Sequence, residues 1–316
     1  MLGAKPSRFR QSRVLIIGCG DVGLRTAPLL LQRGGGMRVM ALTSSPERVS
    51  ALRRAGLTPL LGNLDQPGSL RRLSGLANYV VHLAPPPSEQ WGSENQSKDP
   101  RTMALIRCLR LRTPPKALVY GSTSGVYGDC EGAWVSESRP VNPHSARAQR
   151  RVDAENAVRF LGQSAGVRAS ILRIPGIYAP DREGGTPRPR LLKKTPVLCT
   201  ADDVYTNHIH ANDLARAIQR ALFLGKPQRC LNINDDSTLK MGDYFDLAAD
   251  LYGLPRPPRI ERSTALAQLP LMLLSFMSES RRLRNQRMKT ELRLKLTYPA
   301  VREGLASSPP GQLSLV

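Results

Sequence analysis

The chain has 316 residues, of which 41% are hydrophobic and 22% are charged, a balance typical of a globular protein with a substantial core. Its 46 Lys and Arg residues outnumber its 25 Asp and Glu residues, which gives a formal net charge of +21. Because only 5% of the residues are aromatic and the basic residues are spread along the chain, the composition argues against a nucleic-acid-binding protein. No apolar run reaches the roughly 18–20 residues of a membrane-spanning helix, so we expect no membrane contact.

The five cysteines are scattered, and none is spaced as Cys-x-x-Cys. This pattern argues against a disulfide framework and against a zinc site. Residues 1–12 form a basic N-terminal arm that lacks the apolar core of a signal peptide. We therefore expect a cytoplasmic protein with reduced thiols and no bound metal.

The first predicted strand, residues 14–17, runs directly into a glycine-rich turn. Gly18, Gly20 and Gly23 match the pattern Gly-x-Gly-x-x-Gly, and an apolar periodicity predicts a helix behind them up to Leu31. Gly18 would permit the tight turn, Gly20 the approach of a pyrophosphate, and Gly23 close packing of the helix on the strand. The phosphates of a dinucleotide would lie at the helix N-terminus, where free N–H groups favour negative charge. The alternative is a glycine turn in an ordinary strand–helix unit.

The second predicted strand, residues 37–42, ends in Thr43-Ser44-Ser45, where an NAD site usually has an acidic residue. Arg48 follows closely, in a helix predicted over residues 46–55 with a serine as its cap. A missing carboxylate beside a guanidinium suits a 2′-phosphate, so we favour NADP slightly over NAD. The alternative is that Arg48 only faces solvent.

Further strand–helix units follow along the chain. A strand at 57–61 leads to Asp65, which would bind the adenine amino group or cap the next helix. A strand at 79–84 ends at three prolines, and after a helix around 105–111 the fifth strand covers 117–120. This alternation predicts an α/β fold with a doubly wound parallel sheet of the Rossmann type, which binds ligands beyond the carboxyl ends of its strands.

The rest of the chain continues the alternation. The predicted elements are helix 147–161, strand 167–173, strand 204–209, helix 213–224, strand 230–233 and helix 240–252. We place a nucleotide-binding domain at 13–174, to which later segments return, and a smaller substrate-binding region with a basic C-terminal tail at 175–316. The basic run 281–295 is interpreted as a solvated helix, with an anion-contacting arm as the alternative.

A second motif, Gly-Ser-Thr-Ser-Gly-Val-Tyr-Gly, covers residues 121–128. Together with the glycine-rich turn it resembles the extended short-chain dehydrogenase/reductase superfamily, and within it the NAD(P)-dependent epimerase/dehydratase branch. The segments 173–180 and 208–215 are similar to further motifs of that branch, and the resemblance covers about residues 13–253. It implies a bound NAD(P), a small-molecule substrate in the cleft and a homodimer.

The resemblance also implies contacts to the cofactor. Together with Thr43 and Arg48, the expected cofactor-binding residues are Gly18, Cys19, Gly20, Asp21, Val22 and Gly23 at the pyrophosphate, Asp65 at the adenine, Leu83, Ala84 and Pro85 under the adenosine ribose, and Pro175 in the loop that closes the pocket.

For catalysis, the resemblance aligns Thr123 with an active-site Ser or Thr that binds the reacting oxygen; a hydroxyl that only fixes the turn is the alternative. The family's Tyr-x-x-x-Lys pair, counted back from Glu155, falls on Arg147 and Arg151. Because arginine stays protonated near neutrality, Arg147 is no general acid or base, whereas Arg151 would hold ribose hydroxyls or a phosphate. Spaced by one helical turn, the two predict an anion-binding wall. His144 is the substitute candidate for proton transfer.

Two functions follow from these observations. The first is an NAD(P)-binding oxidoreductase or epimerase/dehydratase-like enzyme that acts on a small, anionic substrate. The alternative is a non-catalytic NAD(P)-dependent binding or regulatory protein, which keeps the glycine-rich turn and has lost the Tyr–Lys pair.

Overall fold

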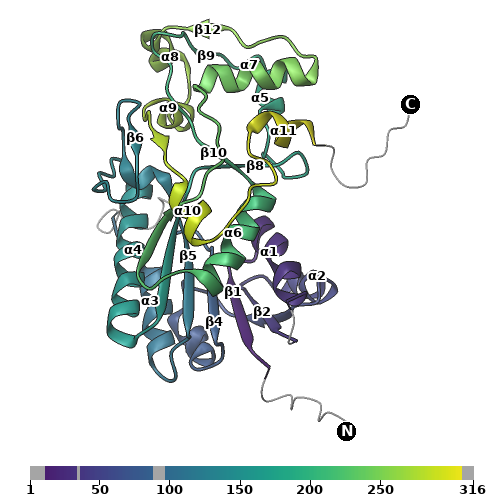
Figure 1. The fold of residues 1–316 in the computed structure, drawn as a ribbon, viewed down its shortest axis with the longest axis vertical. Helices are drawn as coiled ribbons and strands as arrows, with labels where there is room; N and C mark the ends of the chain where they lie inside the picture. Colours follow the sequence, from purple (N-terminus) through teal and green to yellow (C-terminus); the bar gives the residue numbers. More distant parts are fainter. Residues whose placement is uncertain (1–10, 34–35, 88–96, 308–316) are drawn as a thin grey trace.

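The computed structural model describes residues 11–33, 36–87 and 97–307. In this part of the chain, seven parallel strands form one sheet in the order β11-β7-β5-β4-β1-β2-β3 (Figure 1). The strands are β1 (Arg13–Ile17), β2 (Arg38–Thr43), β3 (Thr58–Leu61), β4 (Tyr79–His82), β5 (Ala117–Thr123), β7 (Arg168–Ile174) and β11 (Arg229–Asn232). The chain runs outward from β1 in both directions, so the predicted doubly wound Rossmann-type fold is confirmed.

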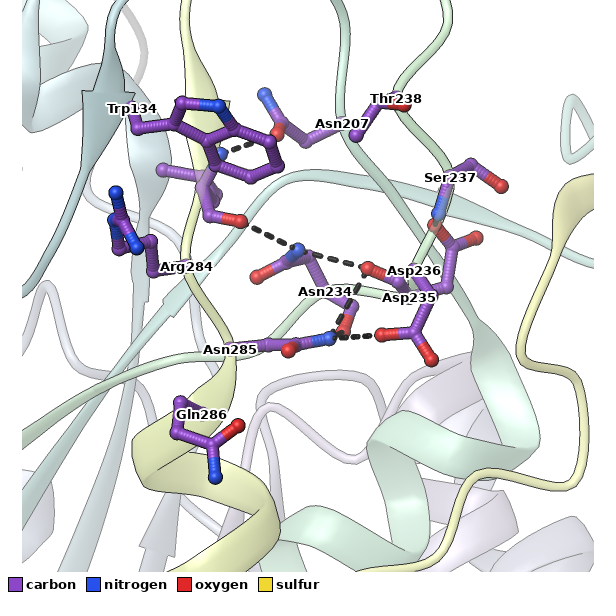
Figure 2. A pocket seen from close by; sticks show the side chains of 11 residues that line it. Trp134, Asn207, Asn234, Asp235, Asp236, Ser237, Thr238, Arg284, Asn285 and Gln286 are labelled. Carbon is purple, nitrogen blue, oxygen red and sulfur yellow. Dashed lines mark hydrogen bonds between the residues drawn. The ribbon is translucent and has the colours of Figure 1, made fainter.

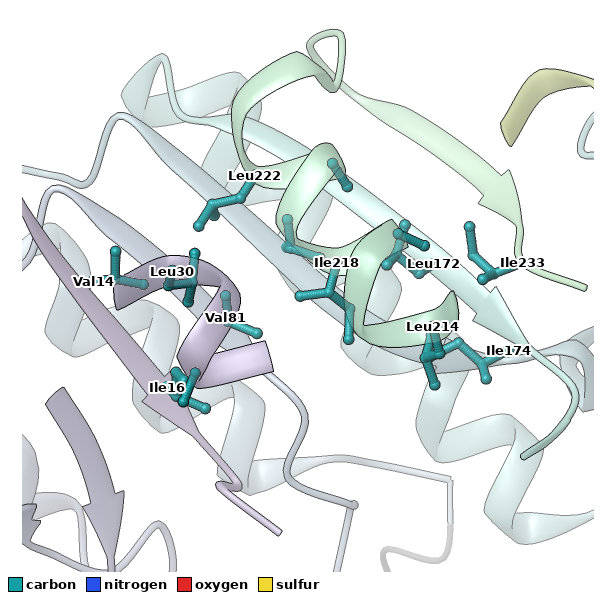
Figure 3. Packing of buried hydrophobic residues seen from close by; sticks show 14 of the residues in the cluster. Val14, Ile16, Leu30, Val81, Leu172, Ile174, Leu214, Ile218, Leu222 and Ile233 are labelled. Carbon is teal, nitrogen blue, oxygen red and sulfur yellow. The ribbon is translucent and has the colours of Figure 1, made fainter. Parts of the chain in front are cut away.

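Helices cover both faces of the sheet, which explains why β1 is apolar at successive positions. The helices are α1 (Asp21–Leu31) and α6 (Ala211–Leu224) on one face, and α3 (Pro100–Arg110) and α4 (Ala146–Ala165) on the other (Figures 1 and 3). Side chains alternate along a strand, so Val14 and Ile16 pack towards α1 and α6, whereas Leu15 and Ile17 pack towards α3 and α4. All four are at most 1% exposed.

Two short helices, α2 (Val49–Arg54) beside β3 and α10 (Gln286–Glu291) beside β11, also belong to the sheet domain. The other elements form a smaller part beyond the carboxyl ends of the strands (Figure 1). They are β6 (Trp134–Val135), β8 (Gly176–Tyr178), α5 (Arg188–Leu192), β9 (Val197–Leu198), β10 (His208–His210), α7 (Met241–Tyr252), β12 (Arg259–Ile260), α8 (Arg262–Gln268), α9 (Leu271–Met277), β13 (Arg282–Leu283) and α11 (Val301–Ala306). A separate apolar cluster holds this part together, with Phe245, Val197 and Val301 among its buried members. Short parallel pairs, β8 with β10 and β9 with β12, tie its segments to one another.

The interpretation of residues 281–295 as a solvated helix is wrong. This run forms β13, which pairs with β6, and then the short helix α10 (Gln286–Glu291). Met288 and Leu292 are fully buried in the same apolar cluster as α6, and Leu294 is 3% exposed. The apolar side chains one turn apart anchor the segment on the sheet domain, while its charged groups remain at the surface.

Several element ends also differ from the prediction. The segment at 46–55 begins as a 3₁₀ turn, and Ser45 makes no capping hydrogen bond through its side chain. The helix expected around 105–111 begins earlier, at Pro100, because Asp99 caps it by accepting from the backbone nitrogen of Thr102. In the described ranges, no helix is long and apolar enough to cross a membrane, and no group of His, Cys, Asp or Glu side chains is arranged to hold a metal.

Candidate functional site

Three glycines shape the sharp turn between β1 and α1. Gly18 has φ +81°, and a Cβ there would lie 2.3 Å from the backbone nitrogen of Ala84. At Gly20 a Cβ would meet no atom within 4 Å, so open space remains at the N-terminus of α1. A Cβ at Gly23 would lie 3.3 Å from the carbonyl oxygen of Gly18, so glycine lets the helix lie close to the turn. This geometry fits a bound pyrophosphate.

The end of β4 lies directly against the glycine-rich turn. The backbone nitrogens of Leu83 and Ala84 both donate to the carbonyl oxygen of Ile17, at 2.7 and 3.1 Å. Pro85, the next residue, is exposed. Cys19 is 2% exposed, and burial raises the pKa of its thiol to about 11. The thiol is therefore protonated at neutral pH, and any contact of Cys19 with a cofactor would come from its backbone.

Arg48 reaches the same turn from the neighbouring strand–helix unit. Its Nη2 donates to the carbonyl oxygen of Cys19 at 2.7 Å, so the side chain does not merely face solvent. Thr43 is buried at the end of β2, where its Oγ1 accepts from the backbone nitrogen of Ser45 at 3.2 Å. Both residues thus lie where the adenosine ribose of a dinucleotide is expected.

Asp65 forms a two-pronged ion pair with Arg101 of α3. The Arg101 Nε and Nη2 lie 2.7 and 2.6 Å from the two carboxylate oxygens. Arg101 Nη1 also donates to the carbonyl oxygen of Pro85 at 3.3 Å, which joins Asp65 to the end of β4. Asp65 does not cap the 3₁₀ turn that follows. Gln66 is the N-cap residue of that turn, and its side chain makes no capping hydrogen bond. The contact of Asp65 with adenine stays a prediction.

The first turn of α1 is tied to the smaller part of the molecule. Asp21 and Val22 are the first two residues of α1. The Asp21 carboxylate accepts from Arg25 Nε at 2.9 Å and from Arg182 Nε at 3.2 Å. Pro175, the residue expected to close the pocket, is half-buried between β7 and β8. Residues from both parts of the chain therefore meet at the glycine-rich turn.

Thr123 fixes the turn at the end of β5. Its Oγ1 accepts from the backbone nitrogen of Gly125 at 3.2 Å, at the start of the 3₁₀ turn Ser124–Tyr127. This is the anchoring role that the sequence offered as the alternative. Because the side chain is only half-buried, its O–H can still donate to a ligand.

Arg147 and Arg151 lie one turn apart on α4, but their side chains have different surroundings. Arg151 is 8% exposed, and its Nη1 donates to the carbonyl oxygen of Gly121 at 2.7 Å and to the Tyr120 hydroxyl at 3.1 Å. Arg147 is exposed, and so is His144 in the loop before the helix. The two guanidinium groups therefore have different partners, with Arg151 bonded to the end of β5, and the anion-binding wall stays a prediction.

The part of the chain that carries these motifs matches a known protein family. A model of the NAD dependent epimerase/dehydratase family matches residues 14–233, more than half of the chain. The chain belongs to this family. The resemblance inferred from the motifs is confirmed at this level, and NAD(P) is the cofactor typical of the family.

Several known proteins resemble the chain to different extents. A conserved protein of unknown function from Silicibacter pomeroyi is 28% identical, with a TM-score of 0.76 over 94% of this chain and 97% of that one. UDP-glucose 4-epimerase from Thermotoga maritima, solved with UDP-glucose, is 18% identical, with a TM-score of 0.74 over 93% and 96% of the two chains. A dTDP-glucose 4,6-dehydratase from Mycobacterium tuberculosis is 32% identical over 123 residues, 36% of this chain and only 37% of the dehydratase.

A buried ion pair that the sequence did not reveal supports the motif after β5 in this family member. Glu155 of α4 accepts from Arg173 of β7 through Nε at 3.1 Å and Nη2 at 2.8 Å. Ser122 Oγ donates to the same carboxylate at 2.7 Å. Glu155 and Arg173 are 2% and 3% exposed. The group therefore joins α4, β5 and β7 directly beneath Thr123.

A second buried polar group lies between β4 and α3. His82 Nε2 lies 2.9 Å from Thr102 Oγ1, which donates to Asp99 Oδ2 at 2.7 Å. Because the Thr102 proton goes to Asp99, His82 donates through Nε2. Burial and the charge of Arg151 lower the pKa of His82 to about 3. The imidazole is therefore neutral at physiological pH. The sequence around His82 did not indicate that Thr102 would be its partner.

A polar cavity of about 200 Å³ lies apart from the glycine-rich turn, beyond the edge strand β11 (Figure 2). The amide nitrogen of Asn234 donates to the carbonyl oxygens of Leu283 and Asp235, at 3.2 and 2.8 Å. Its buried Oδ1 has no hydrogen-bond partner among the residues that the structure describes. None of the residues assigned to the cofactor lines this cavity, and no sequence motif indicated it.

We expect Asp235, beside this cavity, to make the fold less stable as pH rises. The side chain is 1% exposed, and burial raises the pKa of its carboxyl well above the usual value, although Ser237 donates to it. An acid whose pKa is higher in the fold than in the unfolded chain costs stability from about pH 4 upward, about 1.4 kcal/mol for each pKa unit. Asp235→Asn should therefore match the wild-type Tm near pH 4 and exceed it increasingly towards pH 8, as measured by calorimetry.

Asp250, which is exposed on α7 and pairs with Arg256 at 2.8 Å, is the control for this pH dependence. Its carboxylate does not act on Asp235, so Asp250→Asn should give no rise in Tm with pH. Equal Tm differences for Asp235→Asn at pH 4 and pH 8 would contradict the assignment of a protonated Asp235.

Proposed function

We propose that this member of the epimerase/dehydratase family binds NAD(P) across the carboxyl ends of β1, β2 and β4 and acts on a small anionic substrate. The observation that carries the proposal is the open space over Gly20 at the N-terminus of α1, next to a turn in which Gly18 tolerates no side chain. When bound, NAD(P) supplies a hydride donor or acceptor. The epimerase and dehydratase relatives, which are named for nucleotide-linked sugars, make such sugars the substrate class to try first.

The residues around the turn would each hold one portion of the dinucleotide. The backbone of residues 18–23 would donate to the pyrophosphate, and residues 83–85 would support the adenosine ribose. Arg48 is held beside the turn through the carbonyl oxygen of Cys19, where its guanidinium would face a 2′-phosphate. Asp65 would bind adenine through lone pairs that Arg101 leaves free, and Pro175 would close the pocket.

On the substrate side, Thr123 would orient the reacting oxygen through its hydroxyl, which lies at the carboxyl end of β5. Arg147 would bind an anionic group, because its guanidinium is exposed and permanently charged. Arg151 would hold the end of β5 in place through the carbonyl oxygen of Gly121. His144, which is exposed in the loop before α4, is the candidate proton carrier because an imidazole can both donate and accept a proton.

A non-catalytic NAD(P)-dependent binding or regulatory protein is the second candidate. It is favoured by Arg151, whose Nη1 is used by Gly121 and Tyr120 rather than left for a cofactor ribose. The two functions agree on cofactor binding and differ in turnover.

The test is a calorimetric titration of the purified protein with NADH and NADPH, followed by turnover assays with nucleotide-linked sugars. Binding with turnover supports the enzyme, and binding without turnover supports the regulatory protein. Failure of both cofactors to bind would contradict both functions.

For the choice of cofactor, we expect Arg48→Ala to weaken NADPH binding about 10- to 100-fold, which corresponds to one charge-assisted hydrogen bond, and NADH binding less than twofold. The exposed Arg53 of the following helix is the matched control, and Arg53→Ala should change neither affinity. Calorimetry with both cofactors measures the difference. Equal losses for NADH and NADPH would instead mean that Arg48 only holds the backbone of Cys19.

A further inference from the structure

Residues 179–185, which follow β8, form a compact turn. Three backbone hydrogen bonds close it. The nitrogen of Ala179 donates to the carbonyl oxygen of Gly185 at 3.2 Å, the backbone nitrogen of Arg182 donates to the carbonyl oxygen of Ala179 at 3.2 Å, and the nitrogen of Gly185 donates to the carbonyl oxygen of Arg182 at 2.9 Å. These three bonds fix the backbone of the turn without help from a helix or a sheet. The turn can therefore present two of its three charged residues, Asp181 and Arg182, in defined positions.

Asp181 and Arg182 both contact side chains of α1. Arg182 Nε lies 3.2 Å from Asp21, and Arg25 Nη2 lies 2.8 Å from Asp181. Arg25 also contacts Asp21 through Nε at 2.9 Å and the Asn212 side chain of α6 through Nη1 at 2.6 Å. Two ion pairs thus connect the smaller part of the molecule to the first turns of the helix behind the glycine-rich turn.

The position of Asp21 poses an electrostatic problem for a bound pyrophosphate. A carboxylate is favourable at a helix N-terminus, but it repels phosphates that occupy the same place. The guanidinium groups of Arg25 and Arg182 offset that charge. Arg182 uses Nε for Asp21 and Nη1 for the carbonyl oxygen of Ile177, and within the described residues its Nη2 has no assigned partner. Its side chain is 29% exposed, so a ligand at the turn can reach it.

We propose that Arg182 donates a hydrogen bond to the pyrophosphate of the dinucleotide and that Asp21 positions its guanidinium for this contact. The inference rests on the proposed function, because it concerns the same cofactor site. It adds a cofactor-binding residue from outside the glycine-rich turn, supplied by the segment that also bounds the substrate region. Arg25 holds the segment through Asp181 and does not itself contact the cofactor.

The test compares NADH with ADP-ribose, which keeps the pyrophosphate and lacks the nicotinamide, by calorimetry. Arg182→Ala should weaken both ligands equally, by about 10- to 100-fold, as expected for one charge-assisted hydrogen bond. Arg182→Lys keeps the charge without the planar fork and should lose less than tenfold. Asp181→Asn breaks the other ion pair and keeps Arg182, and should lose no more than about threefold. The exposed Arg256 gives the control, and Arg256→Ala should bind as the wild type does.

Three outcomes would overturn the inference. If Arg182→Ala binds both ligands as tightly as the wild type, Arg182 does not contact the pyrophosphate. Equal losses of affinity for Arg182→Ala and Asp181→Asn would mean that both residues only hold the turn in place. A loss for NADH alone would place the contact at the nicotinamide. A wild-type protein that binds neither ligand would contradict the proposed function itself, and melting curves of all variants separate these outcomes from a loss of folding.

Discussion

Gly18→Ala is expected to destabilise the protein by about 3–5 kcal/mol and to lower its Tm by about 5–8 °C. Two effects add. A side chain at φ +81° is strained, and the new Cβ would lie 2.3 Å from the backbone nitrogen and 2.6 Å from the Cα of Ala84. The colliding atoms are backbone, and the nitrogens of Leu83 and Ala84 are both bonded to Ile17, so the end of β4 cannot move away without loss of those bonds.

Gly20→Ala is the matched control, because the same substitution two residues later meets open space. Gly20 has φ −81°, which alanine adopts without strain, and no atom lies within 4 Å of the added Cβ. We expect its stability to stay within about 1 kcal/mol of the wild type, the cost of alanine at a helix N-cap. Its NADH affinity should nevertheless fall at least about tenfold, because the methyl group occupies the approach of the pyrophosphate.

Thermal unfolding and NADH titration of the two variants together separate folding from binding. If Gly18→Ala is as stable as the wild type, the backbone at the end of β4 moves away from the new Cβ more easily than its hydrogen bonds suggest. Unchanged NADH affinity for Gly20→Ala would mean that a dinucleotide, if bound, does not approach the turn at this residue.

The fold was predictable because its signals are local. The apolar run of β1 is buried on both faces, and the helix follows directly after three glycines whose spacing is set by the turn itself. The strands β4, β5 and β7 are also almost entirely buried, whereas β3 at the edge of the sheet is only half-buried. The alternation of strands and helices is therefore enough to predict a doubly wound parallel sheet, because such units connect in few ways.

The site was only partly predictable because its contacts join distant residues. Nothing near Asp65 indicates that Arg101 would occupy its carboxylate, and nothing near Arg151 indicates that its guanidinium would turn towards Gly121. Packing decides both. The basic run at 281–295 is different, because a signal was present. Met288 and Leu292, one helical turn apart, marked a buried face that the surrounding arginines outnumbered.

The second large effect is expected at Glu155, whose removal leaves a buried charge without a partner. Burial alone would lower the pKa of Arg173, but the hydrogen bonds and charge of Glu155 raise it above its ordinary value, so the guanidinium stays charged in the fold. Glu155→Ala should destabilise the protein by about 3–5 kcal/mol, because an uncompensated buried charge costs more than the pair contributes. Ser122 would lose its acceptor in the same step.

A double variant separates the effect of the unpaired charge from the effect of lost packing volume. In Glu155→Leu/Arg173→Met both charges are absent and similar volumes remain, so most of the lost stability should return. The exposed pair of Asp250 with Arg256, at 2.8 Å, is the control, and Asp250→Ala should leave the Tm unchanged within error. If the double variant unfolds as readily as Glu155→Ala, packing rather than charge dominates at this position. If it recovers and NADH binding recovers with it, then the ion pair acts mainly by holding α4, β5 and β7 together beneath Thr123, and the cofactor site depends on that support rather than on the charges themselves.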